Sequence, residues 1–229
     1  YVDTVGLIYY NFHTEEKISI NKDVDFIAAS TYKVGLNILY YHLATIGKIN
    51  LDDEITYDWS DYEEGTGILQ TYEHIGSVTI SELLDFSLIY SDNIATNMLG
   101  HYLGGHASSR QMIYDLLNIT YDSSKNYITA EIEYQILSYL YAHKDNVNFS
   151  HMLDILTKTD FEGRMDKYLP EGLSAHKIGT YDSYVHDVGI ILDNNPYILV
   201  IYTEGVENAD EVIAQISKAI YQYNSMIKS

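Results

Sequence analysis

The stretch Leu173–Thr203, LSAHKIGTYDSYVHDVGIILDNNPYILVIYT, contains three short apolar runs separated by two polar clusters. The clusters Tyr181-Asp-Ser183 and Asp193-Asn-Asn-Pro196 are typical of tight turns. Apolar runs of this length with turn residues between them predict consecutive antiparallel strands. The predicted strands are Leu173–Thr180, His186–Leu192 and Tyr197–Thr203.

The other end of the chain also reads as a hairpin. Val5–Phe12 is apolar, His13–Glu16 resembles a turn, and Lys17–Ile20 returns as a short strand. An amphipathic pattern over residues 206–227 predicts a helix that closes the chain. Because strands lie near both termini, we expect one antiparallel sheet built from both ends, with this helix packed on it.

The middle of the chain has helical periodicity. The segment Asp52–Gly67 is acidic and is expected to be mostly loop, whereas Thr79-Ile-Ser-Glu82 is a capping box that starts a helix. Predicted helices cover residues 30–46, 83–90, 93–103, 107–117, 129–143 and 148–158. The fold class is therefore α+β. We expect a single domain, 1–229, in which residues 1–29 and 171–229 form an α/β lobe and residues 30–170 a mainly helical lobe.

Composition excludes several classes of function. The 229 residues include 33 acidic and 13 basic ones, giving a net charge of −20, which disfavours nucleic acid and anionic membranes as partners. The lack of cysteine excludes disulfides, thiolate metal sites and cysteine nucleophiles. Because no His-Glu-x-x-His spacing is present, we expect no bound metal.

Ser30-Thr-Tyr-Lys33 is the first candidate site. Residues i and i+3 share a helix face, so Lys33 can reach the Ser30 hydroxyl. A lysine with a lowered pKa can serve as the base that activates a serine. The spacing alone is weak evidence, because Ser-x-x-Lys occurs four times in the chain.

Two further motifs lie in settings that suit a site. Ser91-Asp-Asn93 interrupts two predicted helices, where it either points polar side chains into a cleft or caps the second helix. His176-Lys-Ile-Gly-Thr180 lies on a predicted strand, where Gly179 permits a close approach to the backbone and Lys177 suits an anion.

The type, order and setting of these motifs resemble those of class A β-lactamases and the related penicillin-binding proteins. The resemblance rests on Phe26–Lys33, Tyr90–Asn97 and Leu169–Gly179, and it extends over nearly the whole chain. It implies an antiparallel sheet with an inserted helical lobe. It also implies a serine acyl-enzyme hydrolase that acts on β-lactam amides and needs no cofactor.

The resemblance assigns a role to each motif residue. Ser30 would be the nucleophile and Lys33 a candidate base, while Ser91, helped by Lys177, would pass a proton to the leaving nitrogen. Asn93 would bind the amide side chain of the substrate. The third motif includes Gly179 and Thr180, which would line the substrate site. The backbone N–H groups of Thr180 and Ser30 would together form an oxyanion hole.

Other roles follow from the same motifs. Lys177 and Thr180 would hold the substrate carboxylate. Because Lys33 and Lys177 would share one cleft, each is expected to lower the pKa of the other. Asp92 is expected to be structural and to bond loop backbone.

The third motif departs from the family pattern. Ile178 stands where the family has a hydroxyl residue, although Thr180 could compensate. The two arginines, Arg110 and Arg164, lie outside the last strands, so we expect weak carboxylate binding.

The omega loop departs further. Class A enzymes carry a Glu-x-x-Leu-Asn motif there, yet Leu117–Ile128 has only one acid, Asp122. Glu131 and Glu133 follow, and we expect both on a solvated helix face. Without that glutamate, acylation would survive while deacylation stalls.

Two alternatives therefore remain open. The chain could be a D,D-peptidase acting on D-Ala-D-Ala peptides, or a slowly deacylating sensor of β-lactams.

The expected partner is a small-molecule β-lactam or a peptidoglycan stem peptide, and we expect a monomer. The family implies an exported or cell-envelope location, with the targeting segment outside this sequence. Trp59 and the tyrosines are expected to pack rather than bind sugar.

Overall fold

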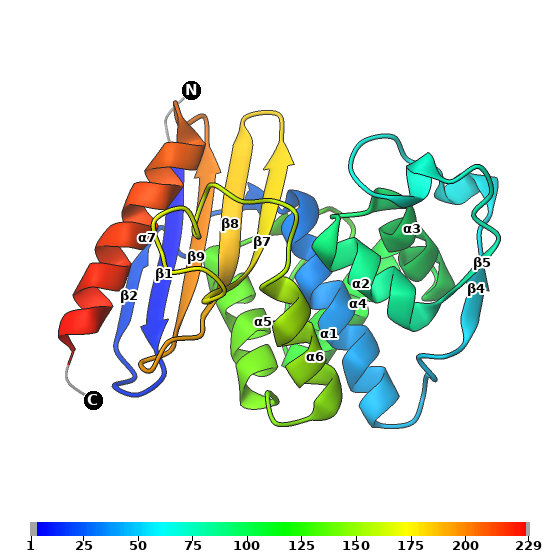
Figure 1. Ribbon diagram of the computed structural model, residues 1–229, viewed down its shortest axis with the longest axis horizontal. Helices are drawn as coiled ribbons and strands as arrows, with labels where there is room; N and C mark the ends of the chain where they lie inside the picture. Colours follow the sequence, from blue (N-terminus) through cyan, green and yellow to red (C-terminus); the bar gives the residue numbers. More distant parts are fainter. Residues whose placement is uncertain (1–3, 228–229) are drawn as a thin grey trace.

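A computed structural model describes residues 4–227, and its centre is a five-stranded antiparallel sheet (Figure 1). The strand order is β2-β1-β9-β8-β7, so the N-terminal hairpin pairs with the last strand, with Leu7 opposite Ile201. The sheet built from both termini is thereby confirmed. Its strands are β1 (Thr4–Asn11), β2 (Lys17–Ile20), β7 (Ser174–Tyr181), β8 (Tyr184–Ile191) and β9 (Tyr197–Glu204).

The two faces of the sheet carry different layers. Figure 1 shows α7 (Ala209–Met226) on one side and the helical lobe on the other. Because successive side chains alternate between faces, Leu199 and Ile201 pack toward α7, whereas Ile198 and Val200 join the core of the helical lobe. The helices of that lobe are α1 (Tyr32–Thr45), α2 (Ile80–Ile89), α3 (Asn93–Tyr102), α4 (His106–Leu117), α5 (Ala130–Ala142) and α6 (Val147–Leu156).

Helix α1 is the central helix of the lobe. Eleven of its 14 residues are buried, as expected for a helix that is apolar on nearly every side. A single 3₁₀ turn, η1 (Ala29–Thr31), leads into it. Since η1 packs against the edge strand β7, the start of α1 lies at the junction of the two lobes.

Short elements complete the lobe. β3 (Phe26–Ile27) pairs with β6 (Tyr127–Ile128), and β4 (Glu54–Thr56) pairs with β5 (Ser77–Thr79). The segment expected to be mostly loop therefore contains a strand, whose partner lies too far along the chain for a local pattern to reveal it. Two 3₁₀ turns, η2 (Trp59–Asp61) and η3 (Leu69–Thr71), lie between these strands.

Two expectations about single residues in this part have opposite outcomes. The capping box at α2 is confirmed, since the Glu82 N–H donates to Thr79 Oγ1 and the Thr79 N–H donates to Glu82 Oε2, both at 3.2 Å. The packing role expected of Trp59 is wrong, because the residue is 76% exposed and its ring contacts only the rings of Tyr62 and Tyr57 among the described aromatic residues. Within residues 4–227, no helix is both long and apolar enough to cross a bilayer.

Candidate active site

Lys33 joins the first two motifs. Its Nζ lies 3.2 Å from Ser30 Oγ, one turn back along η1 and α1. The same atom lies 2.6 Å from the Ser91 carbonyl oxygen, 3.2 Å from Ser91 Oγ and 2.8 Å from Asn93 Oδ1. The fold therefore brings Ser30, Lys33, Ser91 and Asn93 together, although 58 residues separate Lys33 from Ser91.

Burial makes Lys33 suitable as a base. Burial lowers the pKa of Lys33 to about 7, and the charges of Asp92 and Glu63 oppose that shift. A neutral amine has two N–H groups and one lone pair. The two shortest contacts, to the Ser91 carbonyl and Asn93 Oδ1, use both N–H groups. The lone pair is then left to accept the proton of the Ser30 hydroxyl, whose Oγ lies 3.2 Å from Nζ.

Asp92 holds the second motif in place. Its carboxylate accepts the Ala95 N–H at 2.9 Å, capping α3, and the Leu69 N–H at 2.8 Å. The expected structural role of Asp92 is confirmed. Gly67, at φ +129°, packs so closely that a Cβ there would lie 2.4 Å from the Asp92 carboxyl carbon, so only glycine fits.

The third motif lies on β7, at the edge of the sheet. A Cβ on Gly179 would lie 3.0 Å from the Ala28 carbonyl oxygen, so glycine lets the strand approach the nucleophile turn. Lys177 is fully buried, and its Nζ donates a long bond of 3.4 Å to the Ile178 carbonyl. Burial lowers the pKa of Lys177 well below its ordinary value, and the charge of Lys33 lowers it further. The expected mutual effect therefore holds in one direction: Lys33 acts on Lys177, second to burial, whereas the pKa of Lys33 is set by burial, Asp92 and Glu63.

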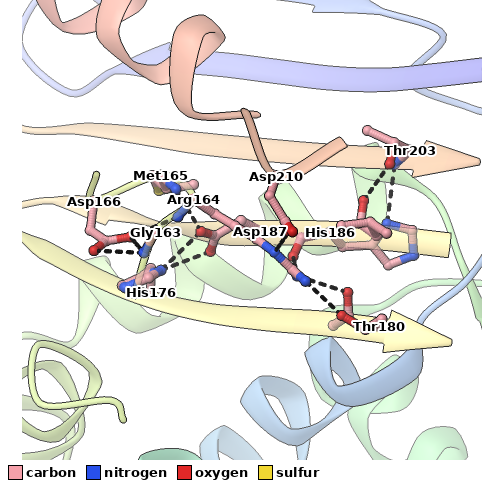
Figure 2. A network of polar contacts seen from close by, with 12 residues as sticks. Gly163, Arg164, Met165, Asp166, His176, Thr180, His186, Asp187, Thr203 and Asp210 are labelled. Carbon is pink, nitrogen blue, oxygen red and sulfur yellow. Dashed lines mark hydrogen bonds and ion pairs between the residues drawn. The ribbon is translucent and has the colours of Figure 1, made fainter. Parts of the chain in front are cut away.

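Arg164 reaches the third motif from the loop before β7, as Figure 2 shows. Its Nη2 donates to Thr180 Oγ1 at 2.7 Å, and its Nη1 donates to the carbonyls of Gly179 at 3.2 Å and His186 at 2.8 Å. An ion pair with Asp210 holds Nε. Arg164 lies outside the strands in the sequence, yet it reaches the third motif, so the weak carboxylate binding expected from its position loses its basis.

Three buried or half-buried groups fix the loop that carries Arg164 (Figure 2). Asp166 accepts the N–H groups of Gly163 and Arg164, and Asp187 accepts the Met165 N–H at 2.9 Å. His176 Nδ1 lies 2.9 Å from Asp187, whose charge raises the pKa of His176 against the opposing effect of burial. Donor atoms of Asp166, His176 and Asp187 lie within 4.8 Å of one another, but these hydrogen bonds already use them.

A cleft of about 640 Å³ lies over the nucleophile. It brings residues of all three motifs to one surface and adds carboxylates from the loop after η2. The residues that matter here are Ser30, Lys33, Asn93, Thr180, Glu63 and Asn126.

The segment 118–128 contributes an amide rather than a carboxylate. Asp122 is exposed, and its Oδ1 accepts the Ser124 N–H. Asn126 lines the cleft, and its Nδ2 donates to the Ala29 carbonyl at 3.4 Å. Asn126 Oδ1 is buried without a hydrogen-bond partner among the described residues. Asn126 was not among the residues expected at the site, because the family pattern calls for an acid in this segment.

Glu133 lies where the sequence did not lead us to expect it. It was expected on a solvated helix face, but it is fully buried on α5. Its Oε2 lies 3.0 Å from Tyr202 Oη, within hydrogen-bond distance. Glu131, two residues earlier, does meet solvent and pairs with Lys17. The helical spacing does contain a signal for this burial, because Glu133 shares a face with the apolar residues Ala130, Ile136 and Leu137.

Comparisons with known proteins agree with this geometry. The Beta-lactamase enzyme family matches residues 1–224. The extended-spectrum β-lactamase PER-1 of Pseudomonas aeruginosa is 24% identical, over 96% of this chain and 82% of that protein.

Solved structures share the fold. A variant of PBP-A, solved as an acyl-enzyme complex with penicillin G, is 21% identical with a TM-score of 0.88, covering 98% of this chain and 91% of that one. A β-lactamase from Sphaerobacter thermophilus DSM 20745 is 24% identical with a TM-score of 0.86, covering 99% and 92%. With the family match spanning nearly its whole length, the chain belongs to the Beta-lactamase enzyme family and is a β-lactamase-like serine hydrolase.

Proposed function

We propose that Ser30 forms a covalent acyl-enzyme with β-lactams and that water then releases the acyl group slowly. The Ser30 proton passes to Lys33 Nζ as Oγ bonds to the lactam carbonyl carbon. The lactam C–N bond breaks, and the nitrogen takes a proton through Ser91 Oγ, which regains one from the Lys33 ammonium. Water later cleaves the ester and restores Ser30.

The observation that carries this proposal is the set of contacts of Lys33. One nitrogen lies 3.2 Å from both Ser30 Oγ and Ser91 Oγ, so it can take a proton from one hydroxyl and return it to the other. Burial keeps much of this amine neutral near pH 7, as a base requires.

The far end of the cleft supplies groups for the rest of the substrate. We assign the amide side chain to Asn93 and the oxyanion to the N–H groups of Ser30 and Thr180. The carboxylate would bind Thr180, with Lys177 beneath it. Because the fold disfavours charge on Lys177, Arg164 would be the permanent cation at this end.

Slow release follows from what lines the cleft near the acyl group. Segment 118–128 places Asn126 there, and its side-chain amide cannot take a proton from the attacking water. A missing general base typically costs about 10²–10⁴ in rate. The same observation favours a second candidate, a D,D-peptidase that acts on stem peptides ending in D-Ala-D-Ala and that β-lactams inhibit.

Time-resolved intact-mass spectrometry with penicillin G tests the proposal. We expect an adduct that forms on the wild type and decays slowly while hydrolysed drug accumulates. Ser30→Ala should form none. The matched control is Ser19→Ala, since Ser19 lies three residues before Lys22 but is exposed on β2.

The outcomes separate the candidates. A permanent adduct together with release of D-Ala from a stem peptide would favour the peptidase. An adduct on Ser30→Ala equal to that of the wild type would overturn the assignment of the nucleophile.

A further inference from the structure

A chain of hydrogen bonds runs from Glu133 to the turn that carries the nucleophile. Tyr202 Oη on β9 lies 3.0 Å from Glu133 Oε2 and 2.9 Å from Thr31 Oγ1. Thr31 Oγ1 in turn lies 2.8 Å from the Ala28 carbonyl oxygen. Glu133, Tyr202 and Thr31 are all fully buried, so water does not compete for these bonds.

The chain ends on a strained turn. Ala29, immediately before Ser30, has φ +48°, a conformation that costs a residue with a side chain on the order of 1–3 kcal/mol. Such a conformation persists only where its surroundings fix it. The bond from Thr31 Oγ1 to the Ala28 carbonyl spans the strained residue, and the Thr31 N–H donates to the same carbonyl at 3.1 Å.

Counting hydrogens determines the state of Glu133. The chain has three bonds, and each needs one hydrogen. Thr31 can give its hydrogen only to the Ala28 carbonyl, because that oxygen has none to offer. Tyr202 must then donate to Thr31, and the third hydrogen must come from the Glu133 carboxyl group. An ionised Glu133 would take the Tyr202 hydrogen for itself, and Thr31 would have to choose between Tyr202 and the Ala28 carbonyl.

We propose that Glu133 is a positioning residue whose protonated carboxyl group completes this chain and thereby fixes the nucleophile turn. The proposal rests on the proposed function for its kinetic test. It assigns a role to a buried acid that lies outside the catalytic motifs.

The surroundings of Glu133 favour the protonated form. Its other oxygen, Oε1, is buried without a partner among the described residues, so an ionised group would have little to offset the loss of water. Burial raises the pKa of Glu133 to about 8, against the opposing bond from Tyr202.

The titratable groups around the chain keep their charge state over the same range. Tyr202 faces Glu133 from β9, and burial raises its pKa well above the ordinary value. Tyr114 faces it from α4 with a pKa raised to about 12 by burial. His186 on β8 packs against the Tyr202 ring, and burial lowers its pKa to about 4. Between pH 6 and 10, Glu133 is thus the member of this group that changes charge.

The test is the acylation rate at saturating penicillin G, followed by mass from pH 6 to 10. Glu133→Gln is neutral at every pH and keeps an N–H for Tyr202. The wild-type rate should fall above about pH 8, whereas Glu133→Gln should show no such fall and should exceed the wild type by up to about tenfold at pH 9. Glu131→Gln, on the same helix but paired with Lys17 at the surface, should fall like the wild type.

A fall in Glu133→Gln that matches the wild type would overturn the proposal. If that variant does not fold, Tyr202→Phe is the second variant, since it removes the hydroxyl but keeps the ring stacked on Phe26. It should slow acylation and lose the same alkaline fall. A Tyr202→Phe profile that matches the wild type would also overturn the proposal.

Failure of the proposed function would be recognisable separately. If no adduct forms on Ser30, infrared spectroscopy still tests Glu133, because a protonated buried carboxyl group has a distinct carbonyl stretch. A band that is present at pH 7, disappears above pH 9 and is absent from Glu133→Gln supports the proposal. No such band at pH 7 overturns it.

Discussion

Arg164 Nη2 donates a 2.7 Å hydrogen bond to Thr180 Oγ1, so a residue 13 positions before Lys177 supplies charge to the third motif. Hydrogen bonds to charged groups are worth about 1.5–3 kcal/mol, or a factor of about 10–100. We therefore expect Arg164→Ala to raise the dissociation constant of penicillin G by that factor, with a smaller effect on the acylation rate at saturation.

The matched control for Arg164 is Lys167→Ala. Lys167 lies on the same loop but forms an exposed pair with Glu211. Stopped-flow acylation over a range of drug concentrations separates binding from chemistry. Equal binding by the two variants would show that Arg164 only braces the loop.

Lys33 sets the acidic side of the pH profile. Because its pKa in the fold is about 7, the acylation rate should rise through pH 7, up to the alkaline fall that we attribute to Glu133 above about pH 8. Lys33→Ala should lose about 10²–10⁴ of the rate. A wild-type rate that is independent of pH between 5 and 8 would contradict the role of Lys33 as a base.

The same pKa has a consequence for stability, with a sign that can be worked out. The unfolded chain binds a proton at Lys33 up to about pH 10.5, whereas the folded chain loses it near pH 7. The contribution of Lys33 to the free energy of unfolding therefore increases as pH rises between those values. Urea unfolding of wild type and Lys33→Met should be measured at pH 6, 8 and 9.5. The free energy of unfolding of Lys33→Met, relative to that of the wild type, should decrease as pH rises. A constant difference would count against the lowered pKa.

Asp92 should matter for stability more than for chemistry. Asp92→Ala removes a helix cap and the bond to Leu69 N–H, which together are worth about 2–4 kcal/mol. Urea denaturation should show this loss, whereas the exposed control Asp23→Ala should stay within about 0.5 kcal/mol of the wild type. An Asp92→Ala variant that is as stable as the wild type but is not acylated would show that Asp92 acts in the chemistry rather than in the fold.

Asn126 should act after acylation. If the Asn126 amide orients the attacking water at the wall of the cleft, Asn126→Ala should lengthen the life of the adduct about tenfold, the value of one lost hydrogen bond to a polar group. Formation of the adduct should change much less. An unchanged lifetime in the mass experiment would exclude Asn126 from hydrolysis.

Much of the fold was predictable because its elements are long and periodic. The runs at Val5, His186 and Tyr197 are apolar strands bounded by turns, and the capping box at Thr79 marks a helix start. The pairing of β4 with β5 was not predictable, since each has only three residues and the partner is far along the chain.

The site residues were predictable where a short sequence motif places them. They were not predictable where only contacts between distant segments bring them to the site. Ser30 and Lys33 are one helical turn apart, so their contact follows from spacing. The role of Arg164 comes from the path of a loop, which leaves no pattern in the sequence. The burial of Glu133 was predictable, because it shares a helix face with Ala130 and Ile136, but its contact with Tyr202 on a distant strand was not.

The central claim is that Ser30, activated by Lys33, carries the acyl group. Intact-mass spectrometry of wild type, Ser30→Ala and Ser19→Ala with penicillin G tests it most directly. We predict one drug-sized adduct on the wild type and on Ser19→Ala, decaying slowly, and none on Ser30→Ala. An adduct that persists in Ser30→Ala, or hydrolysis of the drug by that variant at the wild-type rate, would contradict the account.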